Sequence, residues 1–170
     1  HLIEELRRSV SGEDFDEMPM PELSKNQLDL DEANEFFDGI RKLTPKALLT
    51  LKWLKEHQGK TVPTKGGLLL FGKDKEQFFP DAWIQCGRFM GTTKSEIFDH
   101  YHIHASLPKC VDEVMNFLKK HAFRGADLSQ IRRKDVWSIP LTILREIVIN
   151  ALVHSDYSQR GAPIRVAFFD

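Results

Sequence analysis

The sequence predicts an α+β fold in which helices pack on a small mixed sheet. Apolar residues recur at helical spacing between Leu107 and Ala122, which indicates an amphipathic helix. Apolar residues alternate instead from Ile164 to Phe168, which is typical of a strand. A chain of 170 residues, 41% of them hydrophobic, can bury a core without disulfides or metals.

Composition excludes several classes of protein. The 24 basic and 25 acidic side chains leave a net charge of −1, which gives no overall attraction to DNA phosphates. The longest purely apolar run in the middle of the chain, Leu68 to Phe71, is far too short to span a membrane, so we expect a cytoplasmic protein with no membrane partner. The two cysteines, Cys86 and Cys110, lack zinc-ligand spacing and are expected to be reduced packing thiols.

The first elements suggest an internal fragment of a larger protein. Residues 1–28 read as the trailing helix and linker of an upstream domain, because a helical pattern is followed by the acidic, proline-containing stretch GEDFDEMPMP. Asp29 and Glu32 form a capping-box pattern, which predicts a helix from about Leu30 to Lys42.

The next segment contains a second predicted helix and a strand. Thr44 and Pro45 are typical of an N-cap and a first helical residue, leucines at helical spacing follow, and Gly59 is expected to end the helix. The glycine-punctuated apolar stretch that follows suits a short buried helix or strand before a turn near Pro80. Trp83 to Met90 reads as a strand.

Beyond the amphipathic helix, Asp127 to Ile139 is expected to be extended. Pro140 then begins a helix that continues to about Ser155. We therefore divide the rest of the chain into an α+β connector, residues 29–139, and a C-terminal region, residues 140–170.

One stretch is a near match to a phosphate-binding P-loop. Gly67, Gly72 and Lys73 match the front of the motif, but Asp74 replaces the hydroxyl residue that would contact magnesium. The four residues between the glycines are apolar, whereas a phosphate cradle needs a flexible polar loop. We interpret the stretch as buried packing.

A histidine series and a basic run could each have either a structural or a functional role. His100, His102 and His104 would project from one face of a strand and could bind zinc. No Cys or Glu is arranged nearby to complete such a site, so a structural role is expected. The basic run Arg132 to Lys134 is short and is read as a solvated loop or strand end.

The helix that begins after Pro140 is apolar almost all round, which predicts a buried element. Its polar residues recur at steps of four: Thr142, Glu146, Asn150 and His154. Burying a carboxylate and an amide costs several kcal/mol unless each finds a partner, roughly 2–7 kcal/mol for a neutral group. Either other side chains or a polar ligand contact this row, or the row is exposed to solvent and Glu146 pairs with Arg145 or Arg160.

The segment EIVINALVHSDY resembles the N-box helix of the GHKL ATPase superfamily, in which a Glu is followed four residues later by an Asn. That superfamily includes DNA gyrase, MutL, the ninety-kilodalton heat-shock chaperones and sensor histidine kinases. The longer string LREIVINALVHSDYSQRGAPIRVAFFD is similar to a divergent bacterial branch of transcriptional regulators, named as RecG-related ATP-dependent helicases. FDEMP, LDLDEANEFF and TKGGLLLFGKD match the layout of that branch, so the resemblance covers most of the chain.

The resemblance implies that residues 140–170 begin a GHKL-like α/β sandwich with ATP and magnesium as cofactors. Glu146 would then be the catalytic general base, and Asn150 would bind magnesium and the nucleotide. His154 and Asp156 would line the nucleotide site. The aspartate that reads adenine and the glycine-rich phosphate loops of these ATPases are not among the residues present, and neither is a Walker A motif or a helicase box.

The sequence therefore favours the central fragment of a DNA-binding transcriptional regulator with a GHKL-type ATP-binding module. Members of this branch commonly carry a Schlafen-like AlbA DNA-binding domain, which is expected before His1 and would make the contact with DNA. ATPase activity is expected, if anywhere, in the full-length protein, and this fragment is expected to be inactive. The alternative is a non-catalytic dimerisation or connector module with a degenerate N-box, acting as a homodimer. A third reading is a metal-dependent hydrolase built on the histidine series.

Overall fold

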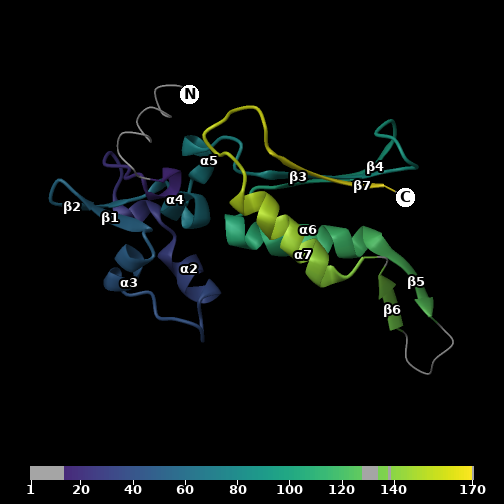
Figure 1. Cartoon of the computed structure of the whole chain (residues 1–170), viewed down its shortest axis with the longest axis horizontal. Helices are drawn as coiled ribbons and strands as arrows, with labels where there is room; N and C mark the ends of the chain where they lie inside the picture. Colours follow the sequence, from purple (N-terminus) through teal and green to yellow (C-terminus); the bar gives the residue numbers. More distant parts are fainter. Residues whose placement is uncertain (1–13, 128–133, 138, 170) are drawn as a thin grey trace. The chain divides into compact units, whose positions relative to one another are not determined.

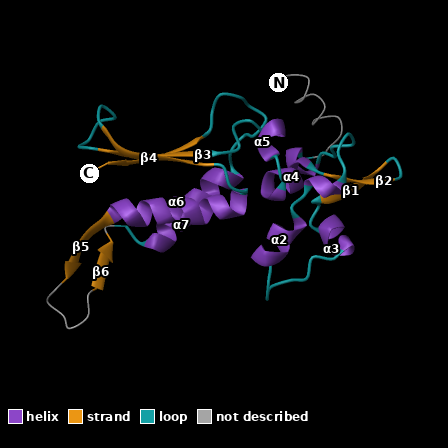
Figure 2. Cartoon of the chain, turned by 180° about the vertical axis from the view of Figure 1, so that it is seen from behind, coloured by secondary structure: helices purple, strands orange, loops and turns teal. Residues whose placement is uncertain are grey.

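The computed structural model describes residues 14–127, 134–137 and 139–169. The chain divides into two compact units, with the boundary between Pro80 and Asp81. Both units combine helices with short strands, so the predicted α+β class is confirmed (Figure 1 and Figure 2). Among the described helices, none is both long enough and apolar enough to cross a bilayer.

The first unit consists of short helices and one β-hairpin. In chain order its elements are η1 (Phe15–Glu17), η2 (Lys25–Gln27), α2 (Leu30–Phe36), α3 (Pro45–Thr50), β1 (Leu54–His57), β2 (Lys60–Pro63), α4 (Lys65–Phe71) and α5 (Lys75–Phe78). The longest described helices of this unit, α2 and α4, have only seven residues each. Helices this short are marginal in water by themselves, so packing within the unit must stabilise them.

Side-chain caps determine where the first helices begin. The Asp29 carboxylate accepts a hydrogen bond from the backbone N–H of Glu32 at 3.0 Å. The Thr44 hydroxyl accepts one from the backbone N–H of Ala47 at 3.2 Å. Both helix starts were predicted from these residues and are confirmed.

Both predicted helix ends are wrong. Helix α2 ends at Phe36 instead of Lys42, and α3 ends at Thr50. Gly59 does not terminate a helix but lies in the turn between β1 and β2, where Gln58 and Gly59 have φ angles of 50° and 77°. Two successive positive φ angles suit a tight hairpin turn. The leucine spacing that suggested one helix is shared between α3 and β1, because both elements bury leucines in the same core.

Residues 14–28, which were expected to be a linker, pack on the first unit. The backbone N–H of Met20 donates to the carbonyl of Pro63 at 2.8 Å, and that of Lys65 donates to the carbonyl of Met18 at 2.9 Å. Leu28 is buried. The trailing helix expected in the first residues lies outside the described part of the chain.

Aromatic rings form the centre of the first unit. The ring centroids of Trp53 and Phe71 are 5.0 Å apart, and those of Phe37 and Trp53 are 5.7 Å apart. At Gly67 in α4, an added Cβ would lie 2.4 Å from the carbonyl oxygen of Trp53. Only glycine allows this approach of helix to backbone. The P-loop-like stretch is therefore a buried helix, as expected from its apolar residues.

The second unit contains the longer helices and a three-stranded sheet. Its elements are β3 (Ile84–Phe89), β4 (Ile97–Ile103), α6 (Leu107–Ala122), β5 (Phe123–Asp127), β6 (Lys134–Trp137), α7 (Leu141–Val153) and β7 (Ile164–Phe169). The strands and helices predicted for this half are confirmed in type. Of the segment expected to be extended, Asp127 ends β5 and Lys134–Trp137 form β6, and these two strands pair antiparallel; residues 128–133 and 138 lie outside the described part of the chain. Of the basic run, Lys134 begins β6, and Arg132 and Arg133 lie outside the described residues.

The sheet of the second unit is mixed and has the strand order β4-β3-β7. β3 pairs with β4 antiparallel and with β7 parallel. Helices α6 and α7 lie side by side along one face of this sheet (Figure 1 and Figure 2). Because β7 pairs with β3, residues after 140 belong to the same unit as residues 81–122. The division expected between residues 139 and 140 does not coincide with the boundary between the units.

The core of the second unit lies between α6 and the sheet. The described members of the stripe predicted on α6 are buried: Leu107, Val111, Val114, Met115 and Leu118. The side chain of Ala122, the last member of that stripe, lies outside the described part. Cys86 of β3 and Cys110 of α6 are both buried thiols that form no disulfide. Burial, together with the neighbouring Cys110, raises the pKa of the Cys86 thiol to about 12. Cys86 is therefore a neutral packing group.

Candidate functional site

Helix α7 is attached to the second unit by one apolar side and one ion pair. Val148 and Leu152 are buried on that side. The guanidinium of Arg145 donates from Nη1 to Oδ1 of Asp112 on α6 at 2.7 Å. Arg145 thus pairs with α6, and the pairing with Glu146 that the sequence allowed is not formed.

The polar row of α7 points away from this packed side. Glu146, Asn150 and His154 are exposed, and they lie opposite Val148 and Leu152 on the helix. The sequence predicted a buried helix and left two alternatives for its polar row: a row met by a partner, or a row that stays in solvent. The structure leaves the row in solvent, so its carboxylate and amide carry no burial cost. The described residues offer no side-chain hydrogen bond to Glu146 or Asn150.

Large apolar side chains flank the polar row on the same outward side. Ile143 is 51% exposed, Ile147 is 58% exposed and Val153 is 69% exposed. A helix side that faces only water normally carries charged and polar residues. Exposed apolar residues grouped around a polar row are typical of a surface that contacts a ligand or another protein segment.

The loop after α7 is ordered by its own contacts. The Tyr157 hydroxyl donates to the carbonyl of Leu152 at 2.8 Å, and burial raises its pKa well above the usual range. Asp156 accepts from the backbone N–H of Ser158 at 3.0 Å and from the side-chain amide of Gln159 at 2.9 Å. Asp156 therefore shapes the loop that leads into β7.

The structure thus brings three of the four predicted site residues onto one helix face. Asp156 lies beyond the end of the helix, and none of the four lines the two cavities described next, which α7 shares with its neighbours. One cavity, of about 320 Å³, lies between α6 and the start of α7 and is lined by Asp112, Met115, Asn116, Lys119, Leu141, Thr142 and Arg145. The other, of about 290 Å³, is mainly apolar and lies between α7 and β7.

The donor chemistry of the row fits magnesium in part. Asn150 supplies an amide oxygen and Glu146 a carboxylate one turn away, and hard cations prefer such oxygen ligands. Among the described residues there is no group of three or more His, Cys, Asp or Glu side chains placed to hold a metal ion. Magnesium bound with a nucleotide takes most of its ligands from phosphates and water. A single protein oxygen on this face could therefore complete its coordination.

His100 and His102 lie on β4, and His104 follows the last residue of that strand. All three side chains are exposed, and their spacing of two places them on one side. Their ring centroids are 5.9 Å apart between the first two and 6.5 Å apart between the last two. The indole of Trp83 stacks on His104, with centroids 5.3 Å apart and an interplanar angle of 18°.

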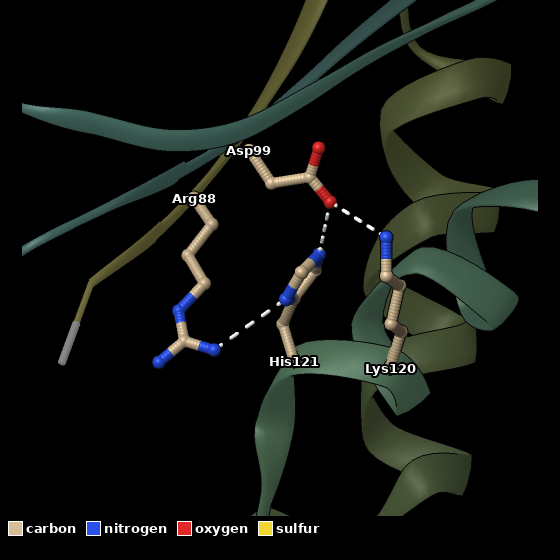
Figure 3. A network of polar contacts seen from close by, with 4 residues as sticks. All are labelled: Arg88, Asp99, Lys120 and His121. Carbon is tan, nitrogen blue, oxygen red and sulfur yellow. Dashed lines mark hydrogen bonds and ion pairs between the residues drawn. The ribbon is translucent and has the colours of Figure 1, made fainter.

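Sequence reasoning missed a polar network at the end of α6. Figure 3 shows that Asp99 of β4 accepts from Nε2 of His121 and from Nζ of Lys120, both at 2.8 Å. Nη1 of Arg88 on β3 contacts Nδ1 of His121 at 3.4 Å. This arrangement fits an imidazole that carries its proton on Nε2.

The network joins two strands to the end of α6. Lys120, and after it His121, lower the pKa of the Asp99 carboxyl. One sequence signal was present, because His121 follows Val114 and Phe117 at helical spacing and so continues the buried side of α6. The strand residues that meet it could not be identified without the register of β3 and β4.

The structure is similar to the crystal structure of the DIP2311 protein from Corynebacterium diphtheriae, a structural-genomics target. The two superpose with a TM-score of 0.68 at 21% sequence identity, over 97% of this chain and 32% of that chain. At this identity the similarity shows a shared fold alone. The chain spans about a third of the length of that protein. No protein-family model matches the sequence. No curated protein matches it either.

Proposed function

We propose that this chain is the central part of a DNA-binding transcriptional regulator in which α7 forms one wall of a GHKL-type ATP site. The observation that carries the proposal is the outward row of Glu146, Asn150 and His154 between exposed apolar side chains. A nucleotide presents both kinds of surface, because its phosphates are charged and its base is flat and largely apolar. The face of α7 is complementary to such a ligand.

The roles follow from the chemistry of each group and from the resemblance to the N-box helix. The side-chain oxygen of Asn150 would bind the magnesium ion that accompanies the triphosphate. Glu146 would accept a proton from the attacking water, because a carboxylate one turn away can reach that position. His154 would line the site, and Asp156 would hold the loop beside it.

This face is one wall of the proposed site. Adenine recognition and phosphate cover are assigned to residues outside this chain, so the 170-residue chain alone is expected to bind Mg-ATP more weakly than about 1 μM. Contact with duplex DNA is assigned to an upstream domain, since this chain has a net charge of −1. A cytoplasmic location belongs to the same proposal.

The second candidate is a connector or dimerisation module with no nucleotide. Ile143, Ile147 and Val153 favour it, because three exposed branched side chains on one helix side would be covered in an interface. In that case Glu146 and Asn150 would be rim residues of the interface.

The test measures Mg-ATP binding and self-association on the full-length protein and its variants. Asn150→Ala is expected to weaken nucleotide binding at least tenfold with magnesium present, and to have little effect in EDTA, because it removes a metal ligand. Glu146→Gln keeps shape and hydrogen bonding, so binding should persist while any hydrolysis is lost. Thr142→Ala, at the far end of the same row, is the matched control and should leave both unchanged.

Calorimetry and sedimentation on the same proteins separate the two candidates. Unchanged magnesium-dependent affinity in Asn150→Ala would refute the nucleotide site. A connector predicts instead that Ile147→Asn dissociates a dimer and that no nucleotide binding exists in the parent protein.

A further inference from the structure

One face of the three-stranded sheet is covered by α6 and α7, and no described helix of the second unit lies on the other face (Figure 1 and Figure 2). Ile84, Cys86 and Ile103 are buried on the face that α6 and α7 cover. Neighbouring residues in paired strands project to the same side, and successive residues alternate. The side of the sheet away from α6 and α7 is here called the outer face, and by this alternation it carries the remaining strand positions.

The strand register places polar and small residues across the middle of the outer face. Gln85 lies between His102 of β4 and Arg165 of β7, and its amide nitrogen is 3.3 Å from Nε2 of His102. Gly87 lies between His100 and Ala167 in the next row. Ala167 is small and exposed, so a flat ligand can approach the backbone of β7 in this row.

Aromatic side chains occupy both ends of the outer face. At one end the Trp83 indole stacks on His104. At the other end Phe89 and Phe169 stack with centroids 5.3 Å apart and an interplanar angle of 20°. The Phe89 ring leans over Gly87, where an added Cβ would meet it at 3.1 Å. Trp83 and Phe89 are six positions apart along the chain, which corresponds to about 20 Å of strand.

The outer face is also complementary in charge to phosphate. Among the described residues of β3, β4 and β7, none whose side chain lies on this face is acidic, and Arg165 is exposed on it. The one acidic residue within these strands, Asp99, lies on the covered side and binds Lys120 and His121 of α6. The chain as a whole is nearly neutral, so this separation of charge is a property of the fold.

We propose that the outer face binds single-stranded nucleic acid. Unpaired bases stack on the Trp83 ring and on the Phe89 and Phe169 pair, and the connecting phosphates lie along Arg165 and the histidine series. An open sheet with aromatic side chains and basic neighbours is a surface on which unstacked bases bind with little sequence preference. Duplex DNA hides its base faces, so it cannot use the aromatic ends.

The test uses fluorescence anisotropy of a labelled ten-nucleotide oligothymidylate with the 170-residue chain, at pH 7 over a salt series. Arg165→Glu is expected to weaken binding at least tenfold and to reduce the salt slope by about 0.7. Trp83→Leu should weaken binding similarly, and Trp83→Phe should retain most of it because a ring remains. Lys119→Glu on α6 makes the same charge change away from the outer face, and its affinity should stay within twofold of the parent.

Three results would overturn the proposal. The first is equal affinity of Arg165→Glu and Lys119→Glu for the oligonucleotide, with both variants folded by circular dichroism. The second is a labelled duplex of the same length that binds as tightly as the single strand. The third is a combination of two results: the chain sediments as a dimer that Trp83→Leu dissociates, and it does not bind the oligonucleotide. In that case a second copy of the chain would occupy the outer face. Failure of the ATP site would leave these measurements unaffected.

Discussion

Replacing Gly67 by alanine tests the closest backbone approach in the first unit. The new Cβ would lie 2.4 Å from the carbonyl oxygen of Trp53, about 1 Å closer than the 3.4 Å at which ordinary contact begins. That carbonyl also accepts the backbone N–H of Thr64 at 3.0 Å. The oxygen therefore cannot move aside without weakening a hydrogen bond that connects the residue before β1 to the N-cap of α4.

Two effects of opposite sign decide the result. In a helix, alanine is favoured over glycine by at most about 1 kcal/mol. Overpacking costs about 1–3 kcal/mol, and a weakened buried hydrogen bond adds roughly 1 kcal/mol. We therefore expect Gly67→Ala to destabilise the first unit by about 1–3 kcal/mol, against the helix propensity. Each kcal/mol corresponds to a fall of about 4–8 °C in melting temperature for a unit of this size.

Urea unfolding followed by the fluorescence of Trp53 measures this effect. A background of Trp83→Phe and Trp137→Phe leaves Trp53 as the reporter of the first unit. Gly66→Ala in the same helix is the graded control, because its Cβ would meet atoms of Asp16 at 3.0 Å instead of 2.4 Å, and it should lose less stability. A Gly67→Ala protein as stable as its parent, or more stable, would refute the packing of α4 against the backbone at Trp53.

Further predictions concern buried and charged groups. Cys86, whose pKa burial raises to about 12, should resist alkylation by iodoacetamide at pH 8 until urea unfolds the second unit, and rapid labelling of the native protein would contradict its burial. Lys120 holds the pKa of Asp99 below its ordinary 3.8, so the stability that Asp99 contributes is full above pH 3.8 and is lost as pH falls through the lowered pKa. In urea titrations from pH 7 downward, the free energy of unfolding of Asp99→Asn should therefore fall less steeply with acid than that of the parent. An equally steep fall would refute the assignment. Thr64→Val should lower the free energy of unfolding in urea by about 1–3 kcal/mol, because the buried hydroxyl donates to the Lys52 carbonyl at 2.6 Å and caps α4. An unchanged midpoint of unfolding would contradict that role. The histidine series should hold no zinc after dialysis, and one equivalent by elemental analysis that is lost in His102→Ala would contradict the structural reading.

Local physical chemistry was sufficient for many of the elements. The capping side chains of Asp29 and Thr44 fixed two helix starts, because an N-cap bond involves residues only three apart. The apolar stripe from Leu107 to Ala122 fixed α6, since one apolar side of a 3.6-residue period must face a core. Alternation along β7 identified that strand in the same way.

Tertiary structure decided the features that depend on which partner covers an apolar face. The leucines at helical spacing before Gly59 predicted one helix. In the structure α3 and β1 share a core, and the segment after α3 forms the β1–β2 hairpin instead. The site residues of α7 could be named from their spacing, yet their exposure could not, because a helix apolar almost all round has no preferred side of its own. Burial of Val148 and Leu152, with the ion pair from Arg145 to α6, turned Glu146 and Asn150 outward. Periodicity gives the composition of each face, and only packing between distant segments determines which face meets water.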